Sequence, residues 1–170
     1  MQTVRQVRHT PVPKAHPRPP GLPNFKHPPV SEVVLSIQFA ALPAMRSVHA
    51  GLYWKEIRKL YPKPSEQAPI PPAFETFGGT PTAAPTFQIQ TLLVPPMPRH
   101  WFETESGEHL VQLQSDRIIH NWRQRNPEMQ YPRYELIRRR FASEVAKLEA
   151  LFRKEQIGEI RPNHCEVTYI

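Results

Sequence analysis

The chain has 170 residues, a net charge of +7, 22 prolines and a single cysteine. One cysteine excludes an internal disulfide framework, and no apolar run approaches the roughly 20 residues that a membrane-spanning helix needs. The N-terminus lacks the apolar stretch of a secretory signal, so we expect a cytoplasmic protein that does not bind membranes.

The prolines concentrate in two segments, with eight near the N-terminus and ten in the middle of the chain. Because proline lacks an amide donor and fixes φ, such segments cannot form the interior of helices or sheets. We therefore expect a basic, disordered, proline-rich arm over residues 1–28. The remainder, residues 29–170, is expected to be an α+β domain that carries a flexible proline-rich insertion at residues 62–85.

In the first half of the chain the sequence predicts two strands and a helix. Residues 32–39 alternate apolar and polar side chains, as a strand with one buried face does. From Arg46 the spacing becomes helical, with Ser47 as the expected N-cap and Tyr61 near the end. The stripe that this helix would bury is His49, Tyr53, Ile57 and Leu60. Residues 87–94, which read FQIQTLLV, are expected to form the next strand.

Residues 101–123 predict three short strands joined by tight turns. The first, at 101–104, and the second, at 109–114, flank a turn that contains Gly107, which is typical of a hairpin. Residues 117–123 return as the next strand. Successive strands with such short connections favour an antiparallel meander.

The last third predicts one long helix and a closing strand. The helix opens at Pro132, and Gly158 is expected to end it. Its apolar side chains recur at intervals of three and four residues: Tyr134, Ile137, Phe141, Val145, Leu148 and Phe152. Such a helix lies across a sheet. Residues 165–170 read as a strand with no tail, which suggests that the chain is a truncated form of a longer protein.

These elements predict an α+β fold in which two helices pack on one face of an antiparallel sheet. The order along the chain is strand, helix, four strands, helix and strand. Arrangements of this kind bind ligands or partners between helix and sheet in other proteins, which is an analogy of fold and not of mechanism.

Several short segments of the chain form a distinctive set: PPVSEV at 28–33, GLYW at 51–54, YP at 61–62, WF at 101–102, LQ at 113–114, NWR at 121–123, YPRYE at 131–135 and VTYI at 167–170. Together they resemble the N-terminal half of a sporadically distributed family of uncharacterised bacterial proteins. The resemblance implies a longer protein with a further β-rich half, in a mobile-element, toxin-control or defence context. It implies no catalytic residue.

The candidate binding residues lie at the end of the third strand and around the long helix. Trp122 could stack on a base or another ligand, with Asn121 and Arg123 beside it. The alternative, favoured by the strand propensity of aromatic residues, is that Trp122 packs on the sheet. Arg133 and Arg140 share a side of the helix and complete the candidate set.

No catalytic residue, metal site or cofactor is predicted. The eight histidines have no ligand spacing, and neither a base nor an oxyanion site is evident for Cys165. The leading hypothesis is a non-enzymatic protein-binding or regulatory module in a bacterial defence or toxin-control system, with a protein partner. The alternatives are a nucleic-acid-binding module that uses the basic arm and the region Arg117–Arg140, and an enzyme of unknown class.

Overall fold

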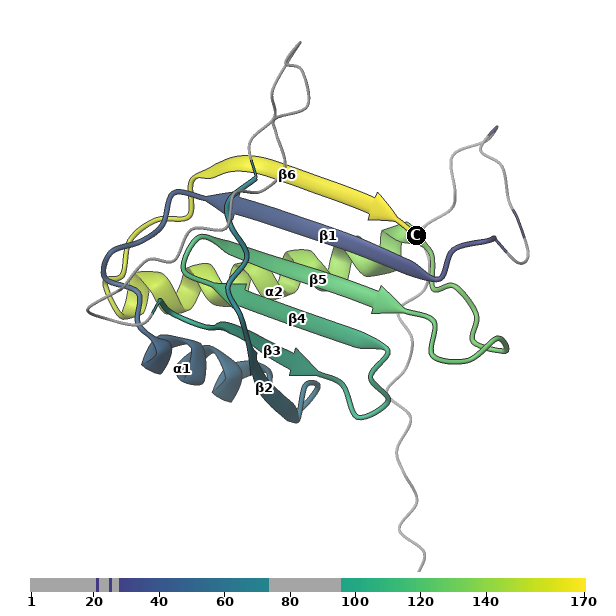
Figure 1. The fold of residues 1–170 in the computed structure, drawn as a ribbon, viewed down its shortest axis with the longest axis horizontal. Coiled ribbons are helices and arrows are strands. Elements are labelled where there is room, and N and C mark those ends of the chain that lie inside the picture. Colours follow the sequence, from purple (N-terminus) through teal and green to yellow (C-terminus); the bar gives the residue numbers. More distant parts are fainter. Residues whose placement is uncertain (1–20, 22–24, 26–27, 74–95) are drawn as a thin grey trace, which may run out of the picture.

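The computed structural model describes Gly21, Phe25, residues 28–73 and residues 96–170. Within these residues the chain forms a six-stranded antiparallel sheet with two helices on one face (Figure 1). The predicted α+β class and order of elements are therefore confirmed. Among the described residues, neither helix combines the length and apolar composition that crossing a bilayer requires.

The elements along the chain are β1 (Glu32–Phe39), α1 (Ser47–Ile57), β2 (Lys63–Gln67), β3 (Arg99–Glu103), β4 (His109–Gln114), β5 (Arg117–Arg123), α2 (Tyr134–Lys154) and β6 (Pro162–Tyr169). Across the sheet the strand order is β2-β3-β4-β5-β1-β6. Tight turns keep β3, β4 and β5 adjacent, as the predicted meander requires. The first strand of the chain lies between β5 and the last strand, which leaves β2 and β6 at the two edges.

The second strand among the described residues lies in a segment for which the sequence predicts no strand. β2 falls inside the segment expected to be a flexible insertion, and it pairs with β3. All five of its residues are exposed, so it has no apolar alternation that would reveal it. Its edge position also tolerates Pro64. The strand predicted at residues 87–94 lies outside the described residues.

Helix α1 starts one residue earlier and ends sooner than the sequence predicts. Arg46, not Ser47, is the N-cap, and its backbone N–H donates to Nδ1 of His49 at 3.0 Å. The regular helix stops at Ile57, so Leu60 no longer lies on the buried side of the helix. Its side chain is 55 % exposed. Tyr61 is buried in its place.

Helix α2 ends in a Schellman motif that the sequence prediction missed. Gln156 adopts a positive φ of 53°, and the N–H of Ile157 donates to the carbonyl oxygen of Phe152 at 2.9 Å. The helix therefore ends at Lys154, before the predicted terminator Gly158. Ile157 is buried, which supplies the hydrophobic contact that usually accompanies this motif.

The hydrophobic core lies between the helices and one face of the sheet. The predicted stripe of α2 faces it: Ile137, Phe141, Leu148 and Phe152 are buried, and Tyr134 and Val145 pack against them partly covered. From the sheet come alternate residues of β1, β3, β4 and β5, among them Val33, Leu35, Phe102, Val111, Leu113, Ile118 and Trp122. One face of the sheet therefore packs against the two helices.

The opposite face of the sheet is polar and is crossed by residues 68–73 (Figure 1). The side-chain amide of Gln38 donates to the carbonyl of Ala73 and accepts from its N–H, at 2.9 and 2.8 Å. Gln114 makes the same pair of bonds with Ile70, both at 2.9 Å. Each glutamine thus binds this segment as a neighbouring strand would.

Candidate functional site

The structure does not bring the predicted binding residues together in one site. Asn121 lies on the polar face, where it accepts a hydrogen bond from Gln112 and donates one to Glu32, at 2.7 and 2.6 Å. Trp122 lies on the other face, fully buried, and its indole N–H donates to Glu108 at 3.0 Å. These neighbours in sequence point to opposite sides of the sheet, as strand geometry requires.

The three arginines of the predicted set are also apart. Arg123 forms an ion pair with Glu103 and donates to the carbonyl of Gly107 at 3.1 Å. Arg133 precedes α2, and its guanidinium donates to the carbonyl of Phe25 at 2.9 Å. Arg140 lies on the core side of α2, close enough to affect the titration of buried groups there.

Those buried groups form a polar cluster around Glu144, which is only 3 % exposed. One carboxylate oxygen lies 2.7 Å from Nδ1 of His120, and the other accepts the hydroxyl of Tyr61. The backbone carbonyl of Glu144 accepts the hydroxyl of Tyr53 at 3.1 Å. Nε2 of His120 in turn lies 3.1 Å from Nδ1 of His109. The cluster therefore joins α1, α2, β4 and β5.

Burial is the main cause of the pKa shifts of His109, Tyr53 and Tyr61 in this cluster. Burial, followed by the charge of Arg140 and by His120, lowers the pKa of His109 to about 2. Burial and then the neighbouring Glu144 raise the pKa of both Tyr53 and Tyr61 above the usual value of 10.0. The tyrosines are therefore neutral donors and His109 is neutral at pH 7. The described residues contain no group of three or more His, Cys, Asp or Glu side chains placed to hold a metal ion.

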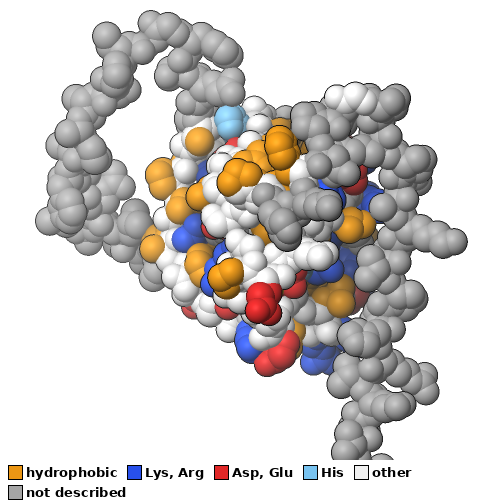
Figure 2. All heavy atoms as spheres, turned by 90° about the vertical axis from the view of Figure 1, so that its right-hand side faces the viewer, with side chains coloured by type: hydrophobic (Ala, Val, Ile, Leu, Met, Phe, Trp, Pro, Cys, Tyr) orange, Lys and Arg blue, Asp and Glu red, His pale blue; other side chains and the backbone are white. Residues whose placement is uncertain are grey.

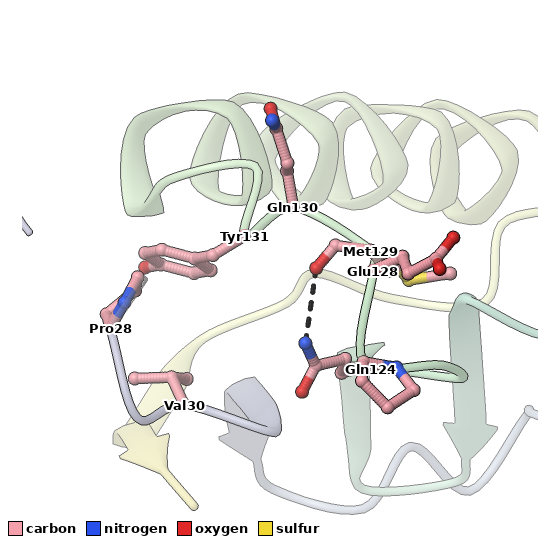
Figure 3. A pocket seen from close by; sticks show the side chains of 8 residues that line it. Pro28, Val30, Gln124, Glu128, Met129, Gln130 and Tyr131 are labelled. Atoms are coloured by element: carbon pink, nitrogen blue, oxygen red, sulfur yellow. Dashed lines mark hydrogen bonds between the residues drawn. The ribbon is translucent and has the colours of Figure 1, made fainter. Parts of the chain in front are cut away.

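A hollow of about 150 Å³ lies at one end of the molecule, away from the Glu144 cluster. Figure 3 shows its lining, in which Gln124 donates to the backbone carbonyl of Met129 at 3.2 Å. The lining residues are Pro28, Val30, Gln124, Pro127, Glu128, Met129, Gln130 and Tyr131. The hollow is smaller than the roughly 300 Å³ at which small-molecule sites begin. It can accept a single side chain.

This hollow adjoins the end of β6. Burial, followed by the nearby Tyr169, raises the pKa of Tyr131 above its usual value of 10.0. Val30 also lies next to Ser31, whose N–H and hydroxyl both donate to the carbonyl of Ile170, at 2.6 and 3.1 Å. The hollow and the last strand thus form one continuous surface.

The outer edge of β6 has no neighbouring strand among the described residues. Opposite residues of paired strands point to the same face, and Val167 and Tyr169 lie opposite the core residues Leu35 and Val33. Both nevertheless remain about half exposed, at 50 % and 51 %, and Ile170 is 61 % exposed. The helices therefore leave the apolar face of the last strand partly uncovered.

Figure 2 shows the end of the molecule at which β6 stops. Hydrophobic side chains gather in its upper part, on the side of β6, whereas acidic and basic side chains gather toward the bottom. The other edge of the sheet differs in character. β2 is five residues long, and it carries Lys63, Pro64 and Glu66, which are residue types that discourage pairing with a further strand. The eight-residue β6 has no proline after its first position and no lysine or arginine.

Sequence reasoning identified the last strand but not its role as an edge, because strand order depends on contacts between distant segments. It also missed Glu144. One signal was available, since a lone carboxyl at the centre of the stripe Ile137–Phe141–Leu148 is unusual for an amphipathic helix.

Comparisons of this chain with protein-family models, with curated protein sequences and with solved structures find no match. The resemblance to a family of bacterial proteins therefore stays an interpretation of the sequence segments.

Proposed function

We propose that the chain is a non-enzymatic protein-binding module that accepts a strand of a partner protein along the outer edge of β6. The observation that carries this proposal is the outer backbone of β6, which pairs with no other described strand, beside half-exposed Val167 and Tyr169. An extended segment that pairs with an open edge gains main-chain hydrogen bonds, and adjacent apolar side chains and hollows give specificity. The hollow beside Tyr131 supplies such a pocket.

Two arginines of the basic segment Arg117–Arg140 are compensated within the fold, which argues against nucleic-acid binding through them. Arg117 forms an ion pair with Asp116 at 3.2 Å, and Arg123 forms one with Glu103. Arg117 is also buried. Phosphate binding needs arginine or lysine side chains that reach the backbone of the nucleic acid, and these two are occupied within the fold. A defence or toxin-control context stays a prediction from the sequence.

The phase of the backbone hydrogen bonds makes the proposal testable. Glu32 and Ile170 exchange both of their N–H···O bonds, at 2.9 and 3.2 Å. In an antiparallel pair such exchanges recur at every second residue, so the amides of Cys165, Val167 and Tyr169 point outward. A bound strand must protect these three amides.

The experiment selects extended peptides from a random displayed library on the immobilised full chain and maps each binder by amide hydrogen exchange. Protection is expected at Cys165, Val167 and Tyr169. The variant V167P should abolish binding because proline has no amide to donate, whereas V167T keeps the amide and a branched side chain and should retain it. The proposal is refuted if the peptides protect amides of other strands, or if they bind V167P as tightly as the unaltered chain. Exchange at β1 amides reports whether each variant remains folded.

A further inference from the structure

We propose that a second copy of this chain occupies the edge of β6, as an antiparallel, two-fold pair with Val167 of each copy on the symmetry axis. This inference rests on the strand-accepting function proposed above and specifies the partner and the register. The result is a continuous sheet through two molecules. Its support comes from the backbone, the side chains and the charge of the edge.

The backbone of β6 allows this register. A two-fold axis perpendicular to the sheet leaves each side chain on its own face, so only residues of the same face can lie opposite each other. With Val167 opposite its own copy, Cys165 lies opposite Tyr169, and Tyr169 opposite Cys165. All three carry outward amides and carbonyls, as the exchange between Glu32 and Ile170 establishes. The pair therefore forms about six intermolecular backbone hydrogen bonds.

The side chains of β6 are self-complementary in the same register. On the face of the helices the half-exposed Val167 covers its own copy, and the ring of Tyr169 covers Cys165, so apolar surface is removed from water. On the other face Glu166 lies opposite Thr168. The Thr168 hydroxyl already donates to the Glu166 carboxylate at 2.6 Å within one chain, and the second copy brings a further hydroxyl to the same carboxylate.

Neighbouring registers are worse. A shift by one residue in each copy puts Glu166 opposite Glu166, where two carboxylates meet at the closest approach of the strands and repel each other. The shift in the other direction puts Thr168 on the axis, and Cys165 then passes beyond the end of β6 in the second copy. The register centred on Val167 is therefore the one that pairs Cys165, Val167 and Tyr169 with one another and keeps the two Glu166 carboxylates apart.

Charge favours this edge for contact between identical molecules. The chain carries a net charge of +7, so two copies repel each other on approach. β6 has no lysine or arginine, and the adjacent Arg161 already forms an ion pair with Glu159 at 3.0 Å. Two copies that meet edge to edge along β6 thus avoid opposing basic side chains, whereas β2 would bring Lys63 to the contact.

A cysteine cross-link tests the register. In the double variant C165S/V167C the two introduced thiols sit on the axis, where the α-carbons of a hydrogen-bonded pair are about 5.5 Å apart, within reach of a disulfide. We expect this variant to form a covalent dimer under mild oxidation. The unaltered chain is its control, because Cys165 and its copy lie four residues apart along the strands, about 13 Å, and should not cross-link. If the unaltered chain cross-links through Cys165 as fast as the double variant does, the register is wrong.

Sedimentation of the full chain tests the association itself. The unaltered chain should dimerise, and V167K should raise the dimer dissociation constant by about tenfold or more, since it places two ammonium groups opposite each other. The control L60K adds the same charge at another exposed apolar residue and should leave the dimer unchanged. Circular dichroism melts of dilute samples check that both variants fold.

The outcomes separate this inference from the proposed function. A chain that stays monomeric to about 0.1 mM, or a dimer that V167K leaves intact, overturns the second copy as partner. If selected peptides still protect the outward amides of β6 in that case, strand acceptance stands and only the identity of the partner is wrong. If neither peptides nor a second copy protect them, both proposals fail.

Discussion

Glu144 is the residue on which the polar contacts between the two helices and the sheet converge. Its carboxylate accepts the hydroxyl of Tyr61 and contacts Nδ1 of His120, and its carbonyl accepts the hydroxyl of Tyr53. A buried polar group is tolerated when each of its partners is satisfied and becomes costly when one partner is removed. The cluster therefore fixes how α1 and α2 sit on the sheet.

Replacing Glu144 by alanine should lower the free energy of unfolding by about 3 kcal/mol, because the hydroxyl of Tyr61 and the ring N–H of His120 lose their acceptor inside the core. E144Q keeps an acceptor oxygen and should lose less. Urea denaturation measures both. E149A removes a half-exposed carboxyl from the same helix and serves as control. An E144A loss no larger than that of E149A would show that the cluster contributes nothing to stability.

At the scale of elements, the segment 68–73 depends on two glutamines rather than on a hydrophobic pattern. Gln38 and Gln114 come from β1 and β4, and each makes a two-way amide bridge to the backbone of the segment. Arg117 adds a hydrogen bond to the carbonyl of Pro71 at 2.9 Å. Residues 68–73 thus cover part of the polar face of the sheet. Glutamine side chains hold them there with the same pair of hydrogen bonds that the backbone of a neighbouring strand would make.

The double variant Q38A/Q114A should release this segment. We expect the amide hydrogens of Ile70 and Ala73 to exchange at least about tenfold faster, since each lost hydrogen bond contributes on the order of 1 kcal/mol. Hydrogen exchange with residue resolution measures it. Q112A is the matched control, because Gln112 lies on the same face but bonds to Asn121. Equal exchange at Ile70 and Ala73 in Q38A/Q114A and Q112A would contradict this account of the segment.

At the scale of the whole molecule, the buried His109 couples folding to pH. The pKa of His109 is about 2 in the folded chain, against an ordinary value of 6.5. Below pH 6.5 His109 is protonated in the unfolded chain but stays neutral in the folded chain. The free energy of unfolding therefore falls as the pH falls. This loss is absent above pH 6.5 and grows as the pH drops toward 2.

Between pH 7 and pH 5, His109 should account for a loss of about 2 kcal/mol in the free energy of unfolding. H109Q removes the titrating group, so its stability should decline less over this interval, whatever its stability at pH 7. Denaturation curves at several pH values give both slopes. H164Q, at a half-exposed histidine of β6, should keep the slope of the unaltered chain. If the free energy of unfolding declines with pH equally in the unaltered chain and in H109Q, His109 does not couple folding to pH.

The sequence by itself determined the kinds of elements and much of their order. Local patterns carried this information. The alternation over residues 32–39 and the apolar stripe of the long helix show which side of each element is buried, and the tight turns between 101 and 123 show which strands follow one another. These signals are sufficient for an α+β fold and for the orientation of α2 against the sheet. They also placed Trp122 in the core as the favoured alternative to ligand stacking.

Only the tertiary structure decided which strands are neighbours, and hence which edge is open. β1 meets β5 and β6 through pairings between segments far apart in the sequence, and no local period encodes such a choice. β2 is held by its ladder with β3 and not by a buried face, so its sequence gives no signal. The surface proposed for binding exists because β6 comes last across the sheet, and that position follows from long-range packing.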